Sequence, residues 1–180
     1  MSNEANENFS FVDSENEVLN FWKENQVFKQ SLEQTKDGEN YIFYDGPPFA
    51  TGLPHFGHLV ASTIKDIIPR YFTMKGRYVS RRWGWDTHGL PIEQQIDKKF
   101  GMSANDFVEK NGIAAYCKEC KDIVLTYTSQ WEKTVERMGR WVDFENDYKT
   151  MDLDFMESVW WVFKEAWDKG LIYEGNKIVP

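Results

Sequence analysis

The chain has 180 residues, a formal net charge of -8 and an aromatic content of 16%. That length fits one domain or part of a larger one, and the aromatic content argues against a disordered chain. No apolar run approaches the roughly 20 residues of a membrane span, and the acidic start MSNEANENFS resembles neither a secretory signal nor a transit peptide. We therefore expect a cytoplasmic protein without membrane contact. The negative charge also argues against a free-standing nucleic-acid-binding module.

The first half of the chain predicts an alternation of helices and short strands. Ser14 and Glu17 have capping-box spacing ahead of a helix with four apolar residues, namely Val18, Leu19, Phe21 and Trp22. The run YIFY, residues 41–44, predicts a buried strand that ends at a Gly-Pro turn. A helix is expected from near Phe56, with Leu59, Ile64, Ile67 and Ile68 on its apolar side. The run RYVS, residues 77–80, predicts the next strand, and this order implies a parallel crossover.

The second half predicts mainly helices. Periodic apolar positions predict three helices, at residues 90–100, 113–138 and 153–169, the last ending at Gly170. The stretch between the second and third helices is interpreted as irregular. Residues 171–179 predict a hairpin with its turn at Glu174-Gly175-Asn176. The expected fold class is therefore α/β, with a helix-rich extension.

The stretch GPPFATGLPHFGH, residues 46–58, predicts a phosphate-binding site. It follows a strand and leads into a helix, at the sheet edge where ligands bind in open parallel sheets. The amino end of a helix offers free N–H groups and partial positive charge. His55 and His58, at i and i+3, would face the same ligand and donate hydrogen bonds to its phosphates. Gly57 has no Cβ, so a flat base could approach the backbone closely.

Several other interpretations stay open on the residues alone. The histidines could be caps or surface residues, or join His88 as three nitrogen ligands of a metal. Six cations between Lys65 and Arg82 fit a solvated face or a phosphate-facing one. Cys117 and Cys120 lack the second pair that a structural zinc site needs, so we expect no zinc, and buried or partly buried reduced thiols.

Two motifs carry a resemblance to a known family. PPFATGLPHFGH resembles the HIGH motif of the class I aminoacyl-tRNA synthetases, and GWDTHGLPIE, residues 84–93, is similar to the isoleucyl enzymes in particular. The segment from Arg137 to Gly175 also resembles the isoleucyl enzymes. The resemblance covers nearly the whole chain from Phe9, and Thr51 matches the eukaryotic cytosolic branch. It implies the first half of a Rossmann-like nucleotide-binding catalytic domain.

The resemblance implies activation of isoleucine by ATP, with Mg²⁺ accompanying ATP, and transfer to tRNA(Ile). His55 and His58 would be the catalytic residues at the ATP phosphates. The ATP-binding residues would be Gly46, Pro48, Phe49, Gly52, His55, Gly57 and His58. Pro47 would line the amino-acid pocket, and Asp86 would bind the ammonium group of the substrate through a charge-assisted hydrogen bond. Asp86 could instead cap a turn before Thr87, and Trp83 and Trp85 are expected to serve packing.

The resemblance also implies a division of the chain and a missing partner motif. Residues 1–38 would form an amino-terminal helical extension, 39–170 the first half of the catalytic domain, and 171–180 the start of the inserted editing region. The second class I motif, KMSKS, does not occur in these residues. We therefore expect the amino-terminal part of an isoleucyl enzyme, with little or no activity alone. A truncated nucleotide-binding or interaction module and another HxGH nucleotidyltransferase are the alternatives.

Overall fold

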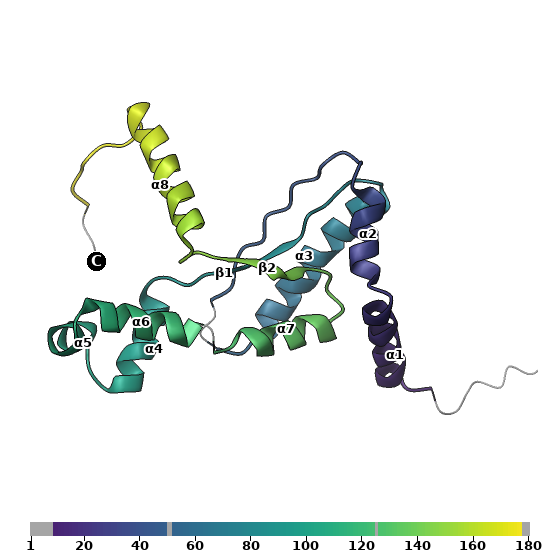
Figure 1. The fold of residues 1–180 in the computed structure, drawn as a ribbon, viewed down its shortest axis with the longest axis horizontal. Coiled ribbons are helices and arrows are strands. Elements are labelled where there is room, and N and C mark those ends of the chain that lie inside the picture. Colours follow the sequence, from purple (N-terminus) through teal and green to yellow (C-terminus); the bar gives the residue numbers. More distant parts are fainter. Residues whose placement is uncertain (1–8, 50–51, 125, 178–180) are drawn as a thin grey trace, which may run out of the picture. The chain divides into compact units, whose positions relative to one another are not determined.

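The computed structural model describes residues 9–49, 52–124 and 126–177. Its elements in chain order are α1 (Phe11–Glu24), α2 (Val27–Thr35), α3 (Phe56–Met74), β1 (Arg82–Trp85), α4 (Leu90–Phe100), α5 (Ala104–Asn111), α6 (Ile113–Val124), α7 (Thr128–Arg137), β2 (Asp143–Lys149) and α8 (Leu153–Asp168) (Figure 1). Thr51, which matches the cytosolic branch, lies outside the described residues. Within them, no helix combines the length and the apolar composition needed to cross a membrane.

The chain divides into two compact units. Among the described residues, unit 1 consists of 9–46, 52–83 and 126–146, and unit 2 of 47–49, 84–124 and 147–177. The mixed helical and parallel-strand architecture confirms the predicted α/β class.

The first helix of unit 1 begins earlier than predicted. The hydroxyl oxygen of Ser10 accepts a hydrogen bond from the Asp13 N–H at 3.2 Å, so Ser10 is the N-cap of α1 and Ser14 lies inside the helix. The prediction was wrong because Ser14 and Glu17 have capping-box spacing by chance, four residues downstream of the actual cap. Gln26 has a φ of 49°, in the left-handed region, and the chain turns at this residue. The second helix, α2, begins at the next residue.

The crossover around α3 is parallel, but its flanking strands are shorter than predicted. Asn40 and Tyr78 form a parallel bridge, in which the Tyr41 N–H donates to the Tyr78 carbonyl at 2.9 Å. The run YIFY is nevertheless neither a ladder nor buried, since Ile42 is 82% exposed. The run RYVS contributes only that bridge, and the regular strand β1 lies downstream of it. Parallel strands bury apolar runs only where neighbouring strands pair with them, and the described residues supply no such neighbours here.

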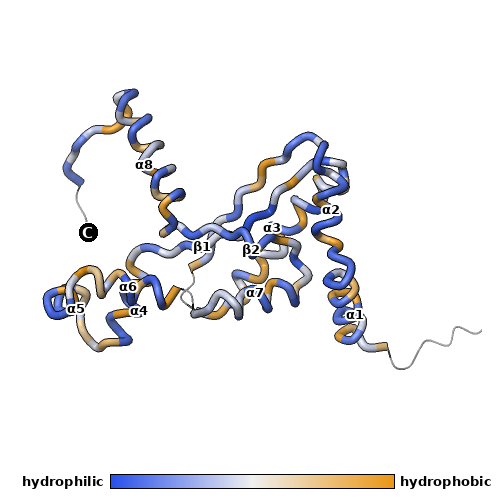
Figure 2. The backbone as a smooth tube through the Cα atoms, viewed as in Figure 1, coloured by the Kyte–Doolittle hydropathy of each residue, from blue (hydrophilic) through white to orange (hydrophobic). Residues whose placement is uncertain are grey.

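Helix α3 exposes much of its apolar side. Its buried residues are Ser62 and Pro69. Apolar residues at heptad-like spacing are exposed, namely Phe56, Val60, Ile64, Ile67, Tyr71 and Met74. Helix α8 has no buried residue, and hydrophobic positions recur along it (Figure 2). Both helices therefore carry apolar faces that the described residues leave uncovered.

Unit 2 contains a small helical core. Ile96, Phe107 and Tyr116, from α4, α5 and α6, form a buried cluster. The single helix predicted over residues 113–138 is wrong, because α6 and α7 are separate helices. Helix α4 has the predicted bounds, and α5, which the sequence analysis missed, begins where the Ser103 hydroxyl accepts from the Asp106 N–H at 3.2 Å.

The stretch interpreted as irregular contains strand β2, which pairs with β1. The two strands run parallel, since the Asp143 N–H donates to the Arg81 carbonyl and the Thr150 N–H to the Trp85 carbonyl. The Tyr148 ring lies over Gly84, where a Cβ would come within 2.3 Å of it. Helix α8 and its end before Gly170, at a φ of 66°, match the prediction. Residues 171–177 contain no strand, so the described part of the predicted hairpin is irregular, and its last residues lie outside the described chain.

Candidate functional site

The two histidines of the predicted site form the first turn of α3. His55 is the N-cap, and its Nδ1 accepts a hydrogen bond from the Gly57 N–H at 3.1 Å. His58 reaches back, so that its Nδ1 accepts from the His55 N–H at 3.2 Å. The two rings stack at a centroid distance of 3.7 Å. The arrangement is a capping box built from histidines, and both the capping and the paired arrangement predicted from sequence occur together.

This capping arrangement sets which nitrogen of each ring carries the proton. A nitrogen that accepts a hydrogen bond uses its lone pair, so each ring holds its proton on Nε2. Each ring therefore presents its Nε2–H as a hydrogen-bond donor at the amino end of a helix. Gly57 permits this geometry, because a Cβ there would lie 3.0 Å from Cε1 of His55. The pair can donate two hydrogen bonds to an anion.

We predict that low pH disrupts the histidine capping box. Partial burial, followed by the charges of His55 and Lys65, lowers the pKa of His58 from 6.5. Since the unfolded chain takes up this proton more readily, the stabilising effect is present above pH 6.5 and is lost as pH falls through the folded-state pKa. The His58 Cε1 proton should titrate at lower pH in the folded chain than in urea, by NMR. Equal midpoints in the two states would contradict the capping geometry.

Two side chains fasten the loop that precedes the histidines. The Trp131 indole Nε1–H, on α7, donates to the Gly52 carbonyl at 2.7 Å, and its ring contacts His58 edge-on at 4.9 Å. The Lys65 ammonium, on α3, donates to the Gly46 carbonyl at 2.8 Å. Sequence analysis gave neither residue a role at the loop. The spacing of 79 residues between Trp131 and Gly52 leaves no local signal for their contact.

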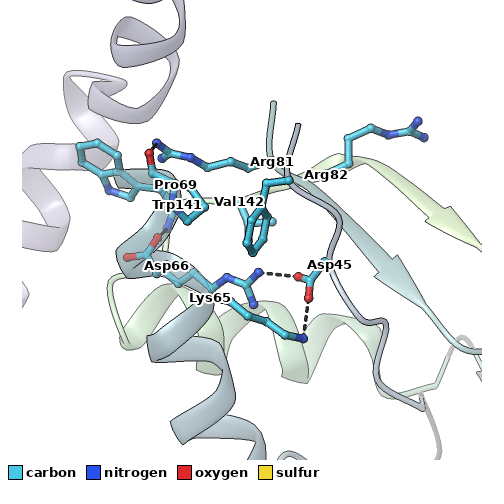
Figure 3. Close-up of a pocket in the computed structure, with 10 residues that line it drawn as sticks. Asp45, Lys65, Asp66, Pro69, Arg81, Arg82, Trp141 and Val142 are labelled. Carbon is cyan, nitrogen blue, oxygen red and sulfur yellow. Dashed lines mark hydrogen bonds and ion pairs between the residues drawn. The ribbon is translucent and has the colours of Figure 1, made fainter. Parts of the chain in front are cut away.

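A buried charge network lies beside Gly46. The Asp45 carboxylate, 2% exposed in its side chain, pairs with Lys65 at 2.5 Å and with Arg140 (Figure 3). The Arg140 guanidinium also donates to the Ser62 hydroxyl at 2.9 Å. Asp45 therefore ties the start of the loop to α3 and to Arg140, three residues beyond the end of α7. These three residues, with others, line a small pocket of about 10 Å³, which is room for one water molecule.

Two arginines of the basic run between Lys65 and Arg82 make packing and ion-pair contacts inside unit 1. Arg81 is 4% exposed and donates to the Pro69 carbonyl at 3.0 Å, and burial lowers its pKa to about 10. Arg70 pairs with Asp66 at 2.5 Å and lies 4.0 Å from the centroid of the Trp141 ring. The interpretation as a solvated face is therefore wrong for Arg81, which is buried. Spacing alone could not reveal their acidic and aromatic partners.

The remaining candidates lie together in unit 2. Phe49 and Asp86 form a parallel bridge, and the Asp86 N–H donates to the Pro48 carbonyl at 2.9 Å. Pro47 and Pro48 are half-buried. The Asp86 carboxylate accepts from the His88 N–H at 3.4 Å, which is the local turn contact that the sequence analysis left open.

The strand neighbours of Asp86 are firmly held. Trp85 is 1% exposed, and its Nε1–H donates to the Asp147 carboxylate at 2.9 Å. The Thr87 N–H donates to the Thr150 hydroxyl at the same distance. Since neighbours in extended chain point to opposite faces, this anchoring fixes the direction of the Asp86 side chain. Trp83 and Trp85 are both buried, as the packing prediction expected.

The structure also bears on the proposed metal ligands and on the expected burial of the two cysteines. Among residues 9–49, 52–124 and 126–177, no three His, Cys, Asp or Glu side chains are grouped to hold a metal ion, so the three histidines form no such set. Both cysteines are free. Cys117 is exposed, which corrects the expectation of burial, because it faces outward from α6. Cys120 is partly buried, and this burial raises its pKa, so its thiol is a poor nucleophile at neutral pH.

Comparison with known proteins identifies the family of the chain. The family model described as "tRNA synthetases class I (I, L, M and V)" matches residues 17–180. A solved structure of a leucyl enzyme from Agrobacterium radiobacter K84, a ternary complex with tRNA and LeuAMS, superimposes with a TM-score of 0.58. It is 21% identical and covers 88% of this chain and 18% of the other, so it supports the fold.

Three curated relatives with high identity to this chain are isoleucine–tRNA ligases. The cytoplasmic isoleucine–tRNA ligase of Arabidopsis thaliana is 58% identical over 96% of this chain, and that of Saccharomyces cerevisiae 57% over 98%. The isoleucine–tRNA ligase of Protochlamydia amoebophila is 58% identical over 95%. The chain spans 14% to 16% of the length of these relatives. The histidine capping box, the parallel crossover and these matches together assign the chain to the class I tRNA synthetases of the isoleucine, leucine, methionine and valine group.

Proposed function

We propose that this chain carries one half of a site that activates isoleucine with ATP, in a cytoplasmic enzyme that then charges tRNA(Ile). The single observation that carries the proposal is the histidine capping box, which presents two Nε2–H donors at the start of α3. The high identity to isoleucine–tRNA ligases supports the choice of amino acid.

In the proposed reaction a carboxylate oxygen of isoleucine attacks the α-phosphorus of ATP. The bond from that phosphorus to the oxygen bridging to the β-phosphorus breaks, and pyrophosphate leaves with its electron pair. His55 and His58 donate to phosphate oxygens while negative charge builds on them. Mg²⁺ would arrive bound to the ATP phosphate oxygens and would offset part of their negative charge.

The other candidate residues would bind the two substrates. Gly57 and Gly52 would leave room for the nucleotide beside the histidines, and Gly46, Pro48 and Phe49 would be further ATP-binding residues. Asp86, held between Trp85 and Thr87, would accept hydrogen bonds from the isoleucine ammonium, with Pro47 against the substrate. We propose that residues 39–170 make up this half-site, that 1–38 support it, and that 171–180 begin the insertion.

The proposal predicts different results for the chain alone and for the chain in a complete enzyme. KMSKS is absent from the 180 residues, so the isolated chain should not exchange pyrophosphate into ATP. The matching segment of the Saccharomyces cerevisiae relative, 57% identical, can be replaced by this chain. That hybrid should catalyse exchange with isoleucine.

The matched control is the same hybrid with His55→Ala and His58→Ala, which should lose about 100-fold or more in rate. Robust exchange by the isolated chain would refute the half-site. A hybrid that folds but is inactive would favour the alternative of a truncated module. Exchange that depends on leucine or valine and not on isoleucine would refute the substrate.

A further inference from the structure

Trp131 contacts the proposed ATP site at two points. Its Nε1–H donates to the Gly52 carbonyl, three residues before His55, at 2.7 Å. The same indole meets the His58 ring at a centroid distance of 4.9 Å and an interplanar angle of 60°. One rigid side chain thus touches both the loop and the second histidine.

Trp131 is itself held in place. It is 3% exposed and lies on α7, with the buried Trp83 ring at a centroid distance of 6.0 Å. An aromatic side chain has only two rotatable bonds, and burial in this packing fixes both. Its position is therefore determined by the core of unit 1 and not by the loop that it contacts.

The histidine pair needs such a support. His55 is exposed and His58 half-buried, and the pair is held by two hydrogen bonds of 3.1 and 3.2 Å within the first turn of α3. First turns of helices fray readily when their contacts are few. The edge contact of Trp131 covers one side of His58, whose other contact is the stacked His55 ring.

We propose that Trp131 is a positioning residue for the His55–His58 pair, holding Gly52 through its Nε1–H and His58 through its ring. This inference rests on the proposed function, because the positioning matters only if the histidines bind ATP. The NMR comparison that tests it needs no ATP. It assigns a role in the site to a side chain that lies 73 positions after His58 in the printed sequence.

The test compares two Trp→Phe variants of the 180-residue chain by NMR. Trp131→Phe removes the indole donor and keeps an aromatic ring. Trp22→Phe is the matched control, because Trp22 lies in the same unit against Trp141 and Gly139, away from the histidines. Trp131→Phe should shift the ring resonances of His58 and the Leu53 amide, which follows the Gly52 carbonyl. Trp22→Phe should leave both unchanged, and His88 should be unaffected in either variant.

ATP binding supplies a second measurement. Trp131→Phe should weaken ATP binding about three- to tenfold, the range expected for one lost hydrogen bond, and Trp22→Phe should not. If the wild-type chain binds no ATP, the resonance shifts decide the positioning role, and the proposed function is decided by the exchange activity of the hybrid enzyme. Shifts in His58 that are no larger for Trp131→Phe than for Trp22→Phe would overturn the inference.

A measurement on the wild-type chain covers the case in which Trp131→Phe does not fold. Nuclear Overhauser contacts from the Trp131 Nε1 proton to the protons of Gly52 and of the His58 ring are expected. Their absence in a folded wild-type spectrum would overturn the inference without any variant.

Discussion

Replacement of Arg140 by methionine is expected to lower the free energy of unfolding by about 3 kcal/mol, measured by urea denaturation. Arg140 and Asp45 are an almost fully buried pair, with side chains 6% and 2% exposed. Removing one partner of a buried pair typically costs about 3–5 kcal/mol, because the other charge stays buried. We expect the low end, because Lys65 still pairs with Asp45 at 2.5 Å.

The double variant Arg140→Met and Asp45→Asn is the control for this mechanism. If the loss comes from an uncompensated charge, the double variant should be less destabilised than the sum of the two single ones. Lys65→Met should cost less than Arg140→Met, since Lys65 is 29% exposed and solvent screens its charge. A loss below about 1 kcal/mol for Arg140→Met would show that this network does not hold unit 1 together.

Replacement of Phe107 by alanine is expected to destabilise unit 2 by about 3–5 kcal/mol, the usual cost of emptying a buried aromatic position. Phe107 is 6% exposed and packs edge-on against Phe100, at 4.9 Å between ring centroids. Its ring is tilted against that of Tyr116, at 5.6 Å between centroids. It connects α5 to both neighbouring helices, so its loss should release α5 from the cluster. Circular dichroism in urea would measure the change.

Two controls separate packing from general loss of apolar surface. Phe107→Leu should cost less than half as much, because most of the side-chain volume remains. Ile113→Ala removes an apolar side chain that is 63% exposed on α6, and should change stability by no more than about 0.5 kcal/mol. Similar losses for Phe107→Ala and Ile113→Ala would contradict the assignment of the core of unit 2.

Helix starts and ends that are marked by neighbouring residues could be predicted from the sequence. Helix α4 begins and ends at the predicted residues, with Pro91 in its first turn and Gly101 after it. The start of α3 at the histidines followed from a strand-to-helix pattern. The α5 cap, Ser103 with Asp106, was an equally local signal that the sequence analysis passed over.

Elements that depend on distant partners could not be placed in this way. The apolar face of residues 113–138 runs on without a break, but α6 packs in the α4–α6 cluster while Trp131 of α7 belongs to the core of unit 1. Strand β2 looks irregular in sequence because charged residues interrupt it. The alternate positions Phe144 and Tyr148 pack on Trp83 and over Gly84, and they were its visible signal.

The residues of the candidate site also divide into those marked by a local motif and those whose roles come from distant contacts. The motifs predicted where the two histidines and Asp86 lie along the chain, and the structure adds how each is held. Trp131, Asp45 and Arg140 have ordinary sequence surroundings, since their roles come from contacts with residues up to 95 positions away. The resemblance to a family points to motif residues and leaves such supporting side chains unmarked.

The chain contains only three histidines, and they make one measurement decisive for the half-site. ATP titrated into the labelled chain should shift the ring resonances of His55 and His58. Isoleucine should shift the backbone amide of His88, because this N–H donates to the Asp86 carboxylate. Saturable shifts that follow this division are the predicted result. Unchanged His55 and His58 resonances at millimolar ATP, in a folded chain, would contradict the assignment of the ATP site.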